Sequence, residues 1–68
     1  MITENTDIGT KVIAQILRNC YIEDVVGRII SMFIEDDDSV STITIEDNDG
    51  KKHQVDLRDT PVEIIEFL

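Results

Sequence analysis

The turn sequence at residues 48–50, Asn-Asp-Gly, lies between two stretches in which polar and apolar residues alternate, a pattern typical of a β-hairpin. A two-residue loop would mix polar and apolar side chains on both faces of the hairpin, because strand side chains point alternately to opposite faces. A three-residue loop, ending on a left-handed Gly50, separates them cleanly. That loop predicts five cross-strand pairs: Thr42 with Asp56, Ile43 with Val55, Thr44 with Gln54, Ile45 with His53, and Glu46 with Lys52.

One face of this hairpin is apolar, so it requires a covering layer. The chain has 68 residues, which is room for one domain, and the cover must therefore come from the remaining residues. We expect a single small acidic domain over residues 1–68, in which the polar segment 1–9 is frayed.

Two stretches before the hairpin have apolar residues at helical spacing. The first runs from Val12 to Cys20 and the second from Ile22 to Phe33. On one continuous helix the two apolar stripes would point in nearly opposite directions. A break at residues 19–21 resolves this conflict, and it predicts two helices folded against each other.

The second stretch has an alternative interpretation. Residues 25–34 are rich in β-branched side chains, which favour strands, and Gly27 disfavours a helix interior. As a strand, this segment would join the hairpin in a small SH3-like barrel that follows an N-terminal helix. We favour the helix, because apolar residues on this strand would point to both faces.

The sequence Thr-Pro-Val-Glu at residues 60–63 combines a capping box with proline at the first helical position. It predicts a short helix that runs to the end of the chain. The expected fold class is therefore α+β, with two N-terminal helices, a β-hairpin and a short C-terminal helix.

Few residues are suited to catalysis or metal binding. Cys20 and His53 are the only cysteine and histidine, and we expect Cys20 to pack as a small apolar residue. Aligning residues 45–56 with a calcium-binding loop puts Ile45 at the first ligand position, where it cannot coordinate. The three glycines stand apart, so no phosphate-binding loop exists. We predict no enzymatic activity, no cofactor and no metal site.

The charge of the chain indicates the class of partner. Its net charge is -9, and residues 35–68 carry -8 of it while residues 1–34 carry only -1. Such an acidic chain would repel nucleic acid, which argues against direct binding. No apolar run is long enough to span a membrane, and the N-terminus lacks the features of a signal peptide, so we expect a cytoplasmic protein.

These observations predict a small non-enzymatic protein–protein interaction module. Its acidic hairpin half would dock on the basic surface of a nucleic-acid-handling protein, as an inhibitor or regulator. Six acidic residues are the expected contacts: Asp36, Asp37, Asp38, Glu46, Asp47 and Asp49. The alternative is a homo-oligomeric or accessory structural subunit that assembles through the apolar helices, as a homodimer through Val25, Ile29 and Phe33. No motif in the chain identifies a family.

Overall fold

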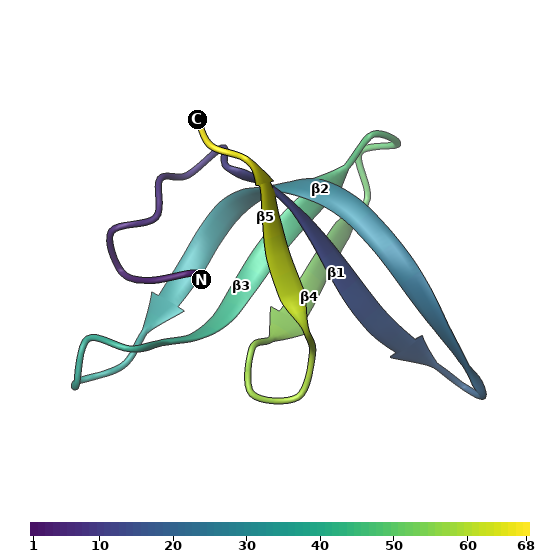
Figure 1. Cartoon of the computed structure of the whole chain (residues 1–68), viewed down its shortest axis with the longest axis horizontal. Coiled ribbons are helices and arrows are strands. Elements are labelled where there is room, and N and C mark those ends of the chain that lie inside the picture. Colours follow the sequence, from purple (N-terminus) through teal and green to yellow (C-terminus); the bar gives the residue numbers. More distant parts are fainter.

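Five β-strands and no helix make up the computed structural model, which describes all residues from 1 to 68 (Figure 1). The strands form one sheet in the order β4-β3-β2-β1-β5, and every neighbouring pair is antiparallel. Their bounds are β1 (Lys11–Arg18), β2 (Tyr21–Ile34), β3 (Val40–Asp47), β4 (Lys52–Asp56) and β5 (Val62–Glu66). No helix in the structure could span a membrane.

The predicted N-terminal helices, and with them the α+β class, are wrong. Their residues form β1 and β2, which carry apolar side chains on both faces, and two-sided strands of this kind imitate helical spacing. In β1, for example, Val12 is buried while its neighbour Ile13 points to the opposite face. The break expected between the two helices is instead a tight turn at residues 19–20. Asn19 adopts the left-handed conformation there, at φ 49°.

The strand considered for residues 25–34 agrees with β2, although the N-terminal helix that accompanied it is absent. This strand is long and irregular. It is bulged at Ile30, where its register against β3 shifts between Ile29 and Ser31.

The predicted C-terminal helix is also wrong. Residues 62–66 form β5, in which Val62 pairs with Ala14 and Ile64 pairs with Val12. A helix cap stabilises by about 1 kcal/mol. Packing Val62 and Ile64 against the core offers about 1.5–3 kcal/mol for each side chain if it is fully buried, so burial outweighs the capping signal.

The β3–β4 hairpin is confirmed in its register. All five predicted pairs are present, and Gly50 adopts the left-handed conformation at φ 81°. The loop is closed by hydrogen bonds from the Asp47 N–H to the Lys51 carbonyl and from the Gly50 N–H to the Asp47 carbonyl. Turn chemistry and face alternation therefore determined this element locally.

The core lies on the inner face of the sheet, which is strongly curled (Figure 1). Seven apolar side chains from four strands are buried in it: Val12, Ala14, Val25, Ile29, Ile43, Ile45 and Val55. The N-terminal segment is attached to this core, because Ile2 packs against it and the Gly9 N–H donates to the Ile29 carbonyl at 2.8 Å.

Candidate functional site

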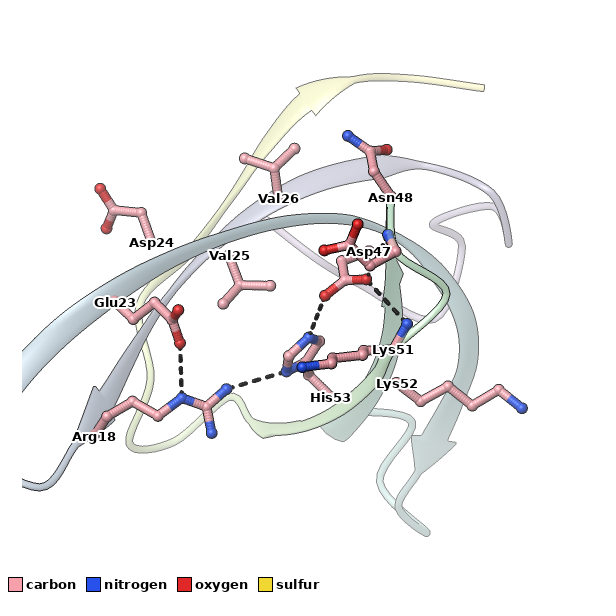
Figure 2. Close-up of a pocket in the computed structure, with 11 residues that line it drawn as sticks. Arg18, Glu23, Asp24, Val25, Val26, Asp47, Asn48, Lys51, Lys52 and His53 are labelled. Atoms are coloured by element: carbon pink, nitrogen blue, oxygen red, sulfur yellow. Dashed lines mark hydrogen bonds and ion pairs between the residues drawn. The ribbon is translucent and has the colours of Figure 1, made fainter.

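A layer of polar side chains covers one end of the core. On each of four strands the inward-facing row carries one polar or charged residue beside a core or core-packed apolar residue. We call this set the polar cap, and its members are Arg18 on β1, Glu23 on β2, Asp47 on β3 and His53 on β4. Figure 2 shows the four side chains meeting below the ribbon of β2.

The polar cap is joined by a chain of hydrogen bonds (Figure 2). The Arg18 Nε donates to Glu23 Oε1 at 2.8 Å, and its Nη2 lies 3.2 Å from His53 Nδ1. On the other side of the ring, His53 Nε2 lies 2.8 Å from Asp47 Oδ2. His53 is thus held between a guanidinium and a carboxylate.

These contacts fix the tautomer of His53. A guanidinium carries only N–H donors, so Nδ1 must accept from Arg18 and cannot carry a proton. The ring proton is therefore on Nε2, which donates it to Asp47. In this arrangement both nitrogens of the imidazole are occupied.

Asp47 also closes the β3–β4 loop. Its Oδ1 accepts the backbone N–H groups of Asp49 at 2.9 Å and of Lys51 at 3.0 Å. The hydrogen bond from His53 lowers the pKa of Asp47 most strongly, burial opposes this shift, and the two backbone N–H groups lower the pKa further. One carboxylate therefore connects the loop to the polar cap.

The contact between Arg18 and His53 shows that the sheet is strongly curled. Their strands, β1 and β4, are separated by β2 and β3. In a flat sheet they would lie roughly 14 Å apart, at about 4.8 Å per strand. The observed 3.2 Å contact requires the sheet to fold over its inner face, and the polar cap bridges the two sides.

An open cavity of about 770 Å³ surrounds the polar cap. Its lining includes no serine, threonine, cysteine or tyrosine, so no hydroxyl or thiol lies beside His53.

Cys20, expected on an apolar stripe, is instead exposed in the β1–β2 turn. No buried polar side-chain atom lacks a hydrogen-bond partner, and no three acidic, histidine or cysteine residues are grouped to hold a metal ion.

The structure divides the six predicted contact residues into two groups. Asp36, Asp37 and Asp38 lie in the turn between β2 and β3, whereas Glu46, Asp47 and Asp49 lie at the far end of β3 or in the loop beyond it. The eight residues of β3 separate the groups by roughly 26 Å, at about 3.3 Å per residue. Asp47 also points inward, toward His53.

A different set of carboxylates lies in the β2–β3 turn and at the β4–β5 turn. A hydrogen bond with Asp56 raises the pKa of Arg58, and the charges of Asp59 and of Glu35, in the β2–β3 turn, raise it further. We call these two turns the acidic end. It contains six carboxylates and the single guanidinium of Arg58: Glu35, Asp36, Asp37, Asp38, Asp56 and Asp59. Sequence reasoning missed three of them, because the two turns are about twenty residues apart in the chain.

Two carboxylates of the acidic end also stabilise their own turns. Asp37 accepts hydrogen bonds from the hydroxyl and the backbone N–H of Ser39, which lower its pKa. Asp56 accepts from the Arg58 side chain and backbone, and these bonds lower the pKa of Asp56. The other four carboxylates accept no hydrogen bond from a side chain of the protein and are free to meet a partner.

The residues predicted to form a homodimer do not share a surface. Val25 is only 7% exposed and Ile29 is fully buried, so both belong to the core, whereas Phe33 is 62% exposed. The helices through which that assembly was expected are absent.

Comparison with known proteins identifies no relative, since no family model, curated protein or solved structure matches this chain.

The lowered pKa of Asp47 predicts that the stability of the fold depends on pH. Because the folded chain lowers the pKa of Asp47 below its ordinary value of 3.8, Asp47 stabilises the fold above that pH. This contribution is lost as the pH falls through the folded pKa. Thermal melts of the wild type and Asp47→Asn should therefore differ most above about pH 5, and converge well below 3.8. A difference in Tm that stays constant down to about pH 2 would contradict this role.

Proposed function

We propose that this chain is a small non-enzymatic interaction module that docks its acidic end on a basic surface of another protein, as an inhibitor or regulator. The observation that supports this proposal is the concentration of carboxylates in the two turns of the acidic end. Its six carboxylates and one guanidinium give a net charge of -5, more than half of the -9 of the whole chain.

The distribution of the remaining charge supports an oriented approach. Lys51 and Lys52 lie at the β3–β4 loop, and Arg18 lies in the neighbouring polar cap. Figure 1 shows this loop at the upper right, the β2–β3 turn at the lower left and the β4–β5 turn at the bottom centre. A chain that is most negative at one end is steered so that this end meets a basic partner first.

The chemistry of the acidic end indicates the kind of basic surface. Carboxylates in adjacent turns present oxygen acceptors to lysine and arginine side chains, as phosphate groups do. A protein that handles nucleic acid carries such a surface, so we propose this class of protein as the partner. The predicted residues Asp36, Asp37 and Asp38 remain contacts in this proposal, and Asp59 and Glu35 join them.

The test compares two triple variants that remove the same number of charges. Asp36→Asn, Asp38→Asn and Asp59→Asn neutralise the acidic end and spare Asp37 and Asp56, which hold its turns. We expect binding to weaken about tenfold, since three exposed charge pairs at roughly 0.5 kcal/mol each approach the 1.4 kcal/mol of a tenfold change. Wild type and variant are immobilised for capture from native lysate, and the affinity of the captured protein is then measured by calorimetry.

The control variant carries Asp24→Asn, Glu46→Gln and Asp49→Asn, at the opposite end of the sheet. It should retain the captured protein with an affinity close to that of the wild type. Binding should also weaken steeply from low to high salt, because exposed charges are screened. Equal losses in both variants, or binding insensitive to salt, would refute docking through the acidic end.

A further inference from the structure

The outer face of the sheet carries an apolar stripe that nothing in the chain covers. Two cross-strand pairs between β1 and β2 form most of it, Ile13 opposite Val26 and Leu17 opposite Ile22. Leu17 is 71% and Ile22 is 64% exposed, and Ile65 on β5 is also exposed. We call these five residues the outer stripe.

The outer stripe is separate from the core and from the polar cap. Figure 2 shows Val26 on the side of β2 opposite to Val25, which is part of the core. The other outward residues of the sheet differ sharply from it, because on β3 and β4 they are all polar: Thr42, Thr44, Glu46, Lys52, Gln54 and Asp56. An antiparallel sheet that faces water on one side normally has such a polar face throughout. The apolar outer face of β1, β2 and β5 therefore indicates a surface that a binding partner covers.

The chain also buries little apolar surface by itself. Its core contains seven buried apolar side chains, whereas eleven large apolar residues are exposed. A domain of this size rarely obtains enough stability from a single core, and association is a common supplement. The same stripe explains why the sequence resembles two helices, since residues that point outward complete the helical spacing.

We propose that a second copy of this chain covers the outer stripe, in a symmetric dimer. The charges around the stripe favour this partner, because they include both signs. Lys11 and Arg28 lie beside it on β1 and β2, and Arg28 pairs with Glu66 at 3.3 Å, while Asp24 and Glu63 lie on the same face. In a twofold interface the same patch meets itself, so bases of one copy can face acids of the other.

The geometry also keeps the β2–β3 turn, with four of the six carboxylates of the acidic end, out of this interface. The β1–β2 turn lies at one end of the view in Figure 1 and the β2–β3 turn lies at the other, along a longest dimension of 33 Å. Two chains of net charge -9 repel each other least where their surfaces are nearly neutral. The dimer therefore leaves the β2–β3 turn free, and it stands independently of the function proposed above.

Sedimentation velocity of the full chain between about 5 and 200 μM, where weak association becomes measurable, tests the dimer. The wild type should sediment as a dimer at the upper concentrations. The double variant Leu17→Ser and Ile22→Ser should weaken dimerisation by about 100-fold or more, since it removes two large aliphatic side chains from the interface. Phe33→Ser is the control, because Phe33 is similarly exposed at the other end of β2 but outside the stripe.

Ile65→Ser provides a second variant from a different strand, and far-UV circular dichroism confirms that each variant is folded. The dimer should persist at high salt, because its apolar contacts are not screened, whereas docking of the acidic end should weaken. A wild type that is monomeric at the highest concentration would overturn the proposal. So would a folded double variant that still dimerises, or a closed assembly larger than two.

Discussion

Replacement of Ile29 by alanine is expected to remove a large share of the protein's free energy of unfolding. Ile29 is fully buried and lies directly opposite Ile45, which is also fully buried. Truncating such a side chain costs about 2–5 kcal/mol through lost burial and the cavity that remains. A 68-residue chain has a total stability of roughly 3–10 kcal/mol, so this single change removes a large share of it. Urea denaturation followed by circular dichroism measures the loss.

Ile30→Ala is the matched control, since it makes the same chemical change one residue along β2. Ile30 is the bulged residue and is 37% exposed, so its truncation should cost less than about 1 kcal/mol. A helix over residues 22–33 would place both isoleucines on its apolar stripe and predict similar losses. Similar losses for the two variants would therefore contradict the register of β2 against β3.

The β3–β4 hairpin could be predicted from sequence because its information is local. Gly50 supplies the left-handed turn residue, and the alternation on both sides allows only one loop length that separates polar from apolar faces. A register error of one residue would move every apolar side chain to the solvent. Turn and pattern therefore specify the same structure.

The first half of the chain could not be predicted in this way, because its strands are apolar on two faces. Ile13 and Leu17 on the outer face of β1, together with Val12 and Ile16 on the inner face, give the spacing of a helix. The signals that favour strands in this half are weaker than the helical spacing. They are the many β-branched residues of β2 and the glycine within it.

The candidate sites depend on the curl of the sheet, which no local pattern contains. Arg18 and His53 are 35 residues apart and their strands are not neighbours, yet their side chains meet in the polar cap. A sequence signal did exist, because His53 was predicted on the inner face of the hairpin. What could not be foreseen was that β1 and β2 also carry charged residues beside the core in their inner rows, Arg18 and Glu23.

The two proposed binding surfaces lie on different parts of the sheet and leave its inner face to the core. The inner face forms the core and the polar cap closes it. The outer stripe offers an apolar surface to a second copy, and the acidic end offers charge to a basic partner. A dimer would present two acidic ends, which would strengthen binding to a partner with two basic patches.

Gly27→Ala is expected to destabilise the protein by about 1–3 kcal/mol, although alanine is the better residue in most regular structure. Gly27 lies in β2 opposite Asp47, and here the backbone of β3 comes very close. A Cβ on Gly27 would lie 2.6 Å from the Glu46 carbonyl oxygen and 3.0 Å from its carbonyl carbon. Both atoms belong to the backbone, so the strands themselves would have to move apart. Urea denaturation gives the change in the free energy of unfolding.

The sign of this effect distinguishes the two interpretations of the segment. Within a helix the same substitution would stabilise by about 1 kcal/mol, because glycine is a poor helix residue. Gly50→Asn is the control, since Gly50 has open space around it and asparagine tolerates its left-handed conformation. That variant should remain within about 0.5 kcal/mol of the wild type. If Gly27→Ala instead raises the free energy of unfolding, the close approach of β2 and β3 is wrong, and with it the curl that brings Arg18 to His53.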